Sequence, residues 1–235
     1  MSRFIIDSKV FEMIPDVCFG AVVAYGIDNH AVNAKIGEIL DKELEQARER
    51  LAGVNLKEYP KIVYYRDAFR AIGINPNRYA NSVEALSKRI MNATPFPQVN
   101  TIVDLGNAIS VKYTLPMGAH DIEKLEGADL EVRPARAADS FVPFGSETAE
   151  PVPEGEIVYV SAGQVRTRRW IWRQSEIGKI DETSSNVIFP IDGFLGKNDD
   201  SIRAAMAELS QILTDVLGCK VKSDFLTAEH NFVEL

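Results

Sequence analysis

The sequence contains little of the chemistry that covalent and metal-dependent enzymes use. It has two cysteines, Cys18 and Cys219, and three histidines, His30, His120 and His230. None of these is spaced like a zinc or redox motif, and no G-x-S-x-G, H-E-x-x-H, C-x-x-C or phosphate-binding glycine loop is present. We therefore expect no metal and no cofactor. Any catalysis has to work by positioning a water molecule and stabilising charge.

Long apolar runs are also missing. No stretch approaches the roughly 18–20 apolar residues that span a bilayer, and residues 1–20 lack the pattern of a signal peptide. We therefore expect a cytoplasmic protein with no membrane partner. The two cysteines lie far apart in the sequence, which favours buried thiols over a disulfide framework.

Positive charge is in deficit. The chain has 26 lysines and arginines against 34 aspartates and glutamates, a net charge of -8. Proteins that hold nucleic acids along a broad surface usually carry a basic face, so general nucleic-acid binding and DNA specificity are not expected. The exception is the stretch 164–179, where arginines and Lys179 outnumber the single acidic residue Glu176.

Hydrophobic periodicity predicts a buried strand, then helices, then short strands and a final helix. The predicted helices cover 33–51, about 61–71, a segment that starts at the cap Asn81 with Glu84 in the capping-box position, about 99–113, and about 201–217. The predicted strands are 17–27, "DLEVRPA", "EIVYVSA", "QVRTRRW", "NVIFPIDGF" and an edge strand in "NFVEL". This order favours a single α+β domain over residues 1–235 rather than a doubly wound α/β fold.

The stretch "RTRRWIWRQSE" holds both tryptophans and four arginines. If it is a strand, Trp170 and Trp172 share one face. Arg169, Ile171 and Arg173 then share the opposite face. The functional interpretation is a cleft wall, where guanidinium groups meet phosphate or carboxylate and indoles stack on a base or an amino-acid ring. The structural alternative is a core or lid in which arginines pack over the tryptophans.

Three further places are candidates for a site. Asn107 lies within a predicted helix although asparagine is a poor helix former, so it faces either a ligand or solvent. His120 follows a Pro-Met-Gly turn and is either a general base or a loop histidine bonded to backbone. The segment "SFVPFGSETAE" is either a lid, with Ser146, Glu147 and Thr148 contacting a ligand, or an ordinary connection.

Several stretches taken in order resemble a known domain family. They are "YYRDAFRAIGINPNRYANSVEALSKRIMN", "VNTIVDLGNAISVKYTLPMGAHD" and "TRRWIWRQSE". They resemble the B3/B4 domain of the phenylalanyl-tRNA synthetase β subunit, and above all the free-standing B3/4-domain proteins. The resemblance implies a three-layer B3/B4 domain of the α+β class, a β-sandwich of unusual topology with flanking helices. It also implies binding of the 3′ end of tRNA and editing hydrolysis of mischarged aminoacyl-tRNA.

The resemblance also assigns site residues. Asn107 in "DLGNAIS" matches the pocket asparagine of the family, and Asn186 falls near a glutamate that recognises tyrosine. Gly118 stands where the family has a histidine, and His120 lies two residues further on. The glycine-rich pocket wall of the family corresponds to "RRWIWRQS". That correspondence gives the candidate substrate-binding residues Arg169, Trp170, Trp172, Arg173 and Gln174.

These departures predict a reshaped pocket. Glycines let a substrate approach the backbone closely, whereas two indoles and an arginine fill or remodel that space. We therefore expect a different aminoacyl group from tyrosine, or a different ligand altogether.

The sequence leaves three functions open. The first is binding of the acceptor end of a charged tRNA, or of a related aminoacyl ester, with hydrolysis. In that case Asn107 and His120 orient water or substrate, and Arg169 and Arg173 hold the terminal phosphate or stabilise developing charge. The second is non-catalytic binding of a small amino-acid-like or nucleotide-like ligand in the same cleft. The third is a protein-interaction module.

Overall fold

The computed structural model describes residues 2–96 and 98–235. The helices, with a short 3-10 turn at Glu123–Leu125, are α1 Ser8–Met13, α2 Ala34–Leu51, α3 Pro60–Ala71, α4 Ser82–Met91, α5 Thr101–Tyr113 and α6 Asp199–Asp215. The strands are β1 Arg3–Ile6, β2 Val17–Tyr25, β3 His120–Asp121, β4 Leu130–Pro134, β5 Ser140–Phe141, β6 Glu150–Pro151, β7 Ile157–Ser161, β8 Gln164–Arg168, β9 Arg173–Gln174, β10 Val187–Phe194, β11 Lys220–Leu226 and β12 Phe232–Glu234.

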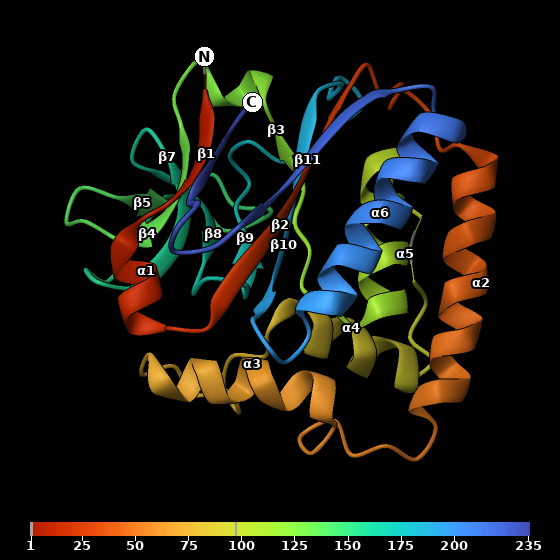
Figure 1. Ribbon diagram of the computed structural model, residues 1–235, viewed down its shortest axis with the longest axis horizontal. Helices are drawn as coiled ribbons and strands as arrows, with labels where there is room; N and C mark the ends of the chain where they lie inside the picture. The colour runs from red at the N-terminus through yellow and green to blue at the C-terminus, as the bar shows by residue number, and fades with distance from the viewer. Residues whose placement is uncertain (1, 97) are drawn as a thin grey trace.

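The strands form two sheets, and helices cover the outer face of the smaller one (Figure 1). The larger sheet has the order β12-β1-β4-β7-β8-β5-β6, with β9 beside β8, and the smaller sheet has the order β11-β2-β10-β3. α2, α5 and α6 lie on one side of the smaller sheet and the larger sheet lies on the other (Figure 1). The predicted α+β class and its three layers are therefore confirmed.

Strand β2 is buried on both faces because it lies in the middle layer. Phe19, Ala21 and Val23 contribute to the core between the two sheets. Cys18 and Val22 contribute to the core between the smaller sheet and the helices. The continuous apolar run that predicted a buried strand thus reflects two cores, one on each side.

Helix α6 approaches the smaller sheet closely at two glycines. A Cβ atom on Gly20 would lie 2.7 Å from both Ile202 Cγ2 and Met206 Sδ, and one on Gly193 would lie 2.4 Å from Ile202 Cδ1. A larger residue at either position would have to displace the side chains of Ile202 or Met206, or shift α6, because these side chains pack in the same core.

Helices α3 and α4 are joined by a buried ion pair. Asn81 caps α4 as predicted, and its Oδ1 accepts from Glu84 N at 2.9 Å. The Glu84 carboxylate, however, does not complete a capping box. It accepts from Arg66 Nη1 at 2.6 Å, and Arg66 also donates to Asn77 Oδ1 at 2.7 Å. Glu84 therefore ties two helices together instead of closing its own helix end.

The strand predicted in "QVRTRRW" is confirmed as β8, but it does not continue through the tryptophans. Strand β8 ends at Arg168, and the next residues form a turn in which Arg169 and Trp170 have φ angles of 47° and 60°. Trp170 N donates to Ile157 O at 2.6 Å, which fixes this left-handed turn against β7. The two tryptophans consequently do not share a strand face. The turn inserts Trp170 into the core, while Trp172 stays half-buried.

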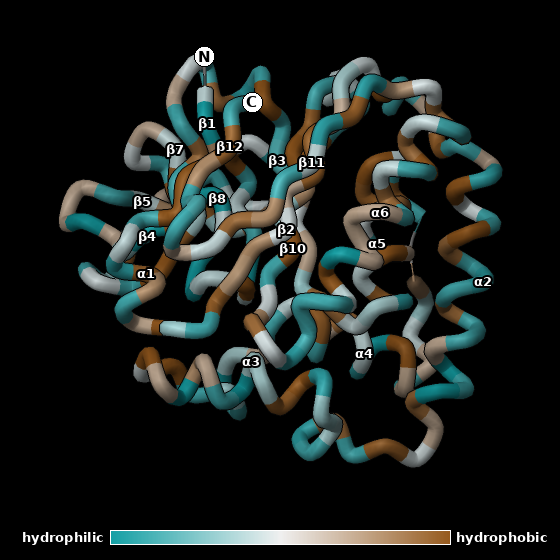
Figure 2. Tube along the Cα trace, viewed as in Figure 1, coloured by the Kyte–Doolittle hydropathy of each residue, from teal (hydrophilic) through white to brown (hydrophobic). Residues whose placement is uncertain are grey.

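Both ends of the described chain contribute to the core between the sheets, since Phe4 and Leu235 belong to the same buried cluster as Trp170. The tail does add an edge strand, as predicted, because β12 pairs antiparallel with β1. The N- and C-termini lie close together in Figure 1, and Figure 2 shows hydrophilic and hydrophobic residues alternating along α2. Across residues 2–96 and 98–235, no helix has the length and apolar character needed to cross a membrane.

Candidate functional site

Two neighbouring hollows lie where the segment 116–120 runs beside β10 and faces the turn between β8 and β9. Backbone bonds anchor this segment, since Gly118 N donates to Pro190 O at 3.1 Å and Asp192 N donates to Pro116 O at 3.1 Å. Hollow 1 has a volume of about 90 Å³ and hollow 2 a volume of about 270 Å³. Three residues line both: Met117, Gly118 and Gln174.

Asp192 supplies a buried carboxyl group to hollow 1. It lies on β10, and its Oδ1 accepts from Tyr159 OH at 2.7 Å and from Trp170 Nε1 at 2.6 Å. Burial raises the pKa of Asp192 to about 7, even though these two hydrogen bonds act to lower it. The carboxyl group therefore exchanges a proton near neutral pH.

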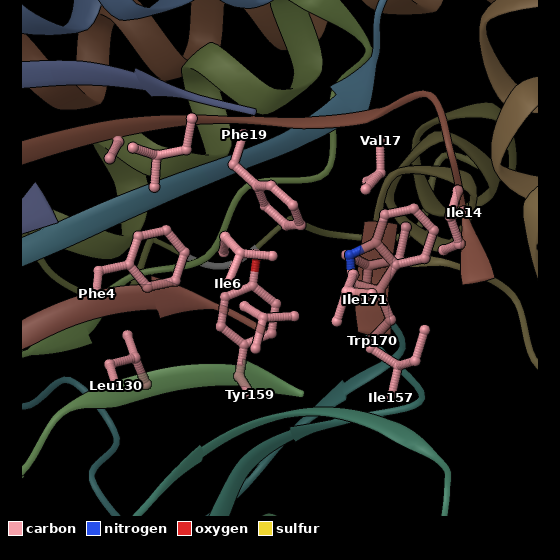
Figure 3. Close-up of a cluster of buried hydrophobic side chains, with 14 of the residues drawn as sticks. Phe4, Ile6, Ile14, Val17, Phe19, Leu130, Ile157, Tyr159, Trp170 and Ile171 are labelled. Carbon is pink, nitrogen blue, oxygen red and sulfur yellow. The ribbon is translucent and has the colours of Figure 1, made fainter. Parts of the chain in front are cut away.

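Tyr159 and Trp170 hold this carboxyl group rigidly. Both are almost completely buried, and Figure 3 shows them side by side in the core between the sheets. Tyr159 stacks on Phe4 with ring centroids 6.0 Å apart, and Trp170 packs edge-on against Phe194 at 6.0 Å. Because both donors are fixed by packing, Asp192 has one well-defined orientation.

His120 lines hollow 1 and is nearly fully buried. Its ring stacks on the ring of Tyr159, with centroids 5.4 Å apart and planes 14° apart. Burial, together with the nearby positive charge of Arg166, lowers the pKa of His120 to about 3. The imidazole is neutral at physiological pH and accepts or donates a hydrogen bond without carrying charge.

Gly118 leaves room for the His120 ring. A Cβ atom at this position would lie 3.3 Å from His120 Nε2 and 3.8 Å from Pro190 Cγ. Gly118 and His120 thus border the same hollow. The sequence left open whether His120 reaches this space, and in the structure it lines hollow 1 beside Gly118.

Trp170, Trp172, Arg173 and Gln174, four of the residues expected to bind substrate, all line hollow 1. Gln174 Nε2 donates to Ala119 O at 3.0 Å, which ties β9 to the segment beside β10. These four side chains therefore form part of one wall of hollow 1. They do so from a turn and a short strand rather than from one continuous strand.

Arg169 lies outside hollow 1, contrary to its predicted role. Its guanidinium group stacks 3.9 Å from the Tyr79 ring centroid and 4.4 Å from the Trp172 ring centroid, and its Nε lies 3.7 Å from Glu156 Oε2. The side chain is occupied in bracing Trp172 from behind. It cannot also hold a phosphate within the hollow.

The other arginines of the stretch are used inside the molecule. Arg168 is buried and forms two hydrogen bonds with the Glu156 carboxylate, at 2.9 and 3.0 Å. Arg166 is buried too and donates to Lys124 O at 3.0 Å. Within the part of the chain that the structure describes, Arg173 is the one exposed arginine of the stretch. Most of the local positive charge therefore stabilises the fold and does not face a ligand.

Asn107 lines hollow 2 and not hollow 1. It lies on α5, facing the segment that carries Met117 and Ala119, and Lys179 borders the same hollow. Asn107 and His120 therefore line two adjacent hollows that share Met117 and Gly118. The prediction that they orient water or substrate would place one residue at each hollow.

The segment predicted as a lid reaches hollow 2 through Phe144, which the sequence analysis did not name as a contact residue. Phe144 lines hollow 2 and is 58% exposed, with Lys179 Nζ 5.5 Å from its ring centroid. Ser146 and Glu147 do not line either hollow, and the Ser146 hydroxyl accepts from Thr148 N at 3.1 Å. These two predicted contacts therefore lie away from the site.

Asn186 also lies away from both hollows. Its Oδ1 accepts from Gly26 N at 3.0 Å, and its Nδ2 donates to Glu123. It joins the start of β10 to β2 and the 3-10 turn. Asn186 was predicted to recognise the substrate, but in the structure it lines neither hollow.

The described residues contain no grouping of three or more His, Cys, Asp or Glu side chains arranged to hold a metal ion. Cys18 and Cys219 are both buried and free, as predicted. The chemistry of the hollows thus rests on Asp192, His120 and their hydrogen-bonding neighbours.

Comparison with known proteins identifies the family. The family model described as "B3/4 domain" matches residues 64–215. This range includes the residues that line the two hollows. The chain belongs to the B3/4 domain family. The matched part of this B3/4 chain begins within α3 and ends with α6, so it contains β7 to β10 and the segment beside β10.

Part of the chain is also similar in sequence to two phenylalanine–tRNA ligase beta subunits. This B3/4 chain is 29% identical over 129 residues to the phenylalanine–tRNA ligase beta subunit of Streptococcus mutans, a match covering 55% of the chain and 15% of that relative. It is 30% identical over 131 residues to the same subunit of Streptococcus pneumoniae, covering 56% of the chain and 16% of the relative. The match thus covers only about a sixth of the length of either relative.

A solved structure also aligns with the chain. It is an N-terminal fragment of the phenylalanyl-tRNA synthetase beta-subunit from Pyrococcus horikoshii, with a TM-score of 0.43 and 11% sequence identity. The alignment covers 94% of this chain and 53% of the fragment.

Asp192 and Tyr159 were missed by sequence reasoning. The signal for Asp192 was present, because "NVIFPIDGF" carries one acidic residue in an otherwise apolar strand, and every residue of β10 is buried. A charged side chain in such a strand is expected to be paired or functional. Tyr159 gave no comparable signal, since tyrosine is common in half-buried strands.

Proposed function

We propose that this B3/4 protein binds the aminoacylated acceptor end of a tRNA, or a related aminoacyl ester, and hydrolyses the ester. Membership of the family and the relatedness to phenylalanine–tRNA ligase beta subunits support the class of ligand. The observation that carries the proposal is the carboxyl group of Asp192, which is buried, fixed by two donors and part of the wall of hollow 1.

Asp192 is the general base in this proposal. Hydrolysis of an ester requires a water molecule to lose a proton as it attacks the carbonyl carbon. A base is most effective when its pKa lies near the working pH, and the pKa of Asp192 is raised to about 7. Oδ1 already accepts two hydrogen bonds, so Oδ2 is the oxygen that receives the proton from water.

His120 is the second polar group of hollow 1. Its neutral ring, next to Gly118, orients the water or the ester carbonyl by a hydrogen bond. With a pKa lowered to about 3 it is a weak base, so the proton transfer itself falls to Asp192. Asp192, which the sequence analysis did not single out, thus takes the role of base that was expected for His120.

Hollow 2 suits the nucleotide end of the ligand. It is three times as large by volume, at about 270 Å³, and it carries the exposed ring of Phe144, the amide of Asn107 and the ammonium group of Lys179. A base stacks on an aromatic ring, and a cation beside it attracts phosphate. The two hollows meet at Met117 and Gly118, where the ester bond would lie.

The acidic character of the chain limits how much RNA it contacts. The net charge is -8, and Arg166, Arg168 and Arg169 are used in the fold. Among the described residues, the cations that line the two hollows are Arg173 at hollow 1 and Lys179 at hollow 2, and Lys179 is already paired with the Glu176 carboxylate. We therefore expect contact with the acceptor end alone, and affinity that depends on salt through few phosphates.

A deacylation panel tests the proposal. Purified protein is incubated with correctly and incorrectly charged tRNAs, and release of the amino acid is compared with release in buffer. Asp192→Asn is expected to slow release by roughly 10²-fold or more, since general bases contribute about that much. Asp215→Asn, an exposed position at the end of α6, is the matched control. Release no faster than in buffer, for every tRNA, contradicts hydrolysis.

A second candidate is non-catalytic binding of a small amino-acid-like ligand. The observation that favours it is the size of hollow 1, about 90 Å³, with its wall of Trp170, Ile171 and Pro190. Such a ligand would raise the melting temperature without being changed. Stabilisation by free amino acids, combined with no release from any charged tRNA, would favour this candidate over the hydrolase.

A further inference from the structure

Hollow 1 is small, and it opens to solvent and borders hollow 2 at Met117, Gly118 and Gln174. Its volume is about 90 Å³, whereas a cavity of about 150 Å³ is the size that takes up benzene in a protein core. From this difference we infer that hollow 1 selects aminoacyl esters with side chains the size of alanine, serine, threonine or valine, and rejects phenylalanine and tyrosine. The inference deepens the proposed function and rests on it.

The inner walls of hollow 1 cannot retreat at low cost. Trp170 is completely buried and packs against Phe69 and Phe194 at centroid distances of 6.4 and 6.0 Å. Tyr159 is held between Phe4 and His120 by stacking at 6.0 and 5.4 Å. Moving either ring would break close-packed contacts on its far side. The inner part of hollow 1 is therefore shaped by the core, whereas its rim includes the exposed Arg173 and the half-buried Gln174.

The outer wall is braced as well. Trp172 meets the ring of Tyr79 edge-on at a centroid distance of 5.0 Å, and the Arg169 guanidinium group lies 4.4 Å from its centroid. Arg169 is in turn held by Tyr79 and Glu156. The arginine-rich stretch thus serves to keep an indole in place against the hollow.

The side chain of the aminoacyl group is expected to lie in hollow 1, because the proposed base, Asp192, lines that hollow. The ester carbonyl must lie beside Asp192 for the attacking water to be activated. The remaining lining is mostly apolar, with Pro116, Ile171 and Pro190, and adds the hydroxyls of Ser82 and Thr167. A small aliphatic side chain fits this lining, and an apolar pocket does not strongly reject an added hydroxyl of the same size.

The wild-type protein provides the first test. It is assayed for release of alanine, serine and valine, and of phenylalanine and tyrosine, from their tRNAs. We expect release of the small amino acids to be faster by at least about tenfold, since even one methylene group alters recognition by that factor. Aromatic esters released as fast as small ones would overturn the size selection while leaving the hydrolysis proposal intact.

Substitution of the outer wall provides the second test. Trp172→Ala removes a half-buried ring that lines hollow 1 and should raise the ratio of aromatic to small release by at least about tenfold. Phe232→Ala removes an exposed ring on β12, far from both hollows along the sheet order, and is the matched control. An unchanged ratio in a folded Trp172→Ala protein would contradict the role of this indole.

A binding measurement separates failure of the inference from failure of the proposed function. The melting temperature of the wild-type protein is measured with millimolar alaninamide, valinamide, phenylalaninamide and tyrosinamide. Stabilisation by the small amides alone supports size selection even if no tRNA is deacylated, a result that would defeat hydrolysis only. Equal or greater stabilisation by the aromatic amides overturns the inference. No stabilisation together with no release overturns both.

Discussion

The indole nitrogen of Trp170 lies 2.6 Å from Oδ1 of Asp192, and this hydrogen bond joins the turn after β8 to a central strand of the other sheet. One contact therefore does two things. It helps to hold the two sheets together, and it fixes the orientation of the carboxyl group in hollow 1. Stability and the proposed chemistry depend on the same pair of residues.

Replacement of Trp170 should cost far more stability than replacement of Trp172. Trp170→Phe removes a donor from a buried carboxyl group and leaves unfilled volume, so we expect a loss of roughly 2–4 kcal/mol in the free energy of unfolding. Trp172→Phe retains a ring at a half-buried position and should cost less than about 1.5 kcal/mol. Urea denaturation of both variants measures this. Equal losses would contradict the difference in burial.

The buried carboxyl group of Asp192 should make stability depend on pH. Its pKa rises from 3.8 to about 7 on folding, so the folded state holds the proton more tightly. The stabilising contribution is present below about pH 4 and is lost as the pH rises through 7, by about 4 kcal/mol. Asp192→Asn lacks this dependence. The measurement is the difference in free energy of unfolding between the two proteins as a function of pH, in which the effects of other groups cancel. A difference that does not change with pH would exclude a raised pKa.

His120 should remain neutral at every pH at which the protein is normally handled. Its pKa falls from 6.5 to about 3 on folding, because burial disfavours the charged ring. Its contribution to stability is therefore present above about pH 6.5 and is lost as the pH falls toward 3. In NMR spectra, the ring signals of His120 should not shift between about pH 5 and pH 8. Titration of these signals near pH 6.5 would show that the ring is not buried as described.

Gly178 should be much less tolerant of substitution than Gly196. Both have left-handed φ angles, 72° and 69°, so alanine is strained at either position. A Cβ atom on Gly178 would also lie 2.2 Å from Arg166 Nη1, whereas one on Gly196 meets nothing within 4 Å. We expect Gly178→Ala to lower the free energy of unfolding by roughly 1–3 kcal/mol more than Gly196→Ala, the scale of overpacking, and its midpoint of thermal unfolding to be correspondingly lower. Similar midpoints for the two variants would mean that Arg166 moves away without cost.

Arg173 should account for part of the salt dependence of tRNA binding. It is exposed and lines hollow 1, whereas the neighbouring arginines are used within the fold. Arg173→Ala is expected to reduce the slope of log affinity against log salt by about 1, the amount for one phosphate contact. Arg136→Ala, which removes an exposed arginine outside both hollows, serves as the comparison. Equal slopes for all three proteins would exclude a phosphate contact at Arg173.

Sequence periodicity predicted most of the long elements correctly. The helices now labelled α2 to α6 and the strands β2, β4, β7, β8, β10 and β12 lie within a few residues of their predicted positions. β1, α1 and β11 were not predicted, because each is short or carries a mixed polar pattern that gains its structure from pairing. Asp192 was missed for a related reason, since it lies within an apolar strand that was interpreted only as core.

The alternating Trp-x-Trp pattern at 170–172 illustrates where local rules stop. Period-two alternation predicted a strand, but the backbone turns into the left-handed region at Arg169 and Trp170. The cost of that turn is offset by burying the Trp170 ring and by its hydrogen bond to Asp192, both of which involve residues far away in the sequence. No pattern within the stretch itself records those partners.

The sequence by itself determined the order of helices and strands, the absence of a covalent or metal-binding motif, and the resemblance to the B3/4 family, because these depend on residue types and local spacing. Only the tertiary structure decided what the arginines and tryptophans do. It placed Arg166, Arg168 and Arg169 in internal contacts, set Asn107 and His120 at two adjacent hollows, and brought Tyr159, Trp170 and Asp192 together. The physical reason is that burial and long-range pairing set both the pKa of Asp192 and the volume of hollow 1, and neither quantity exists until the two sheets have packed.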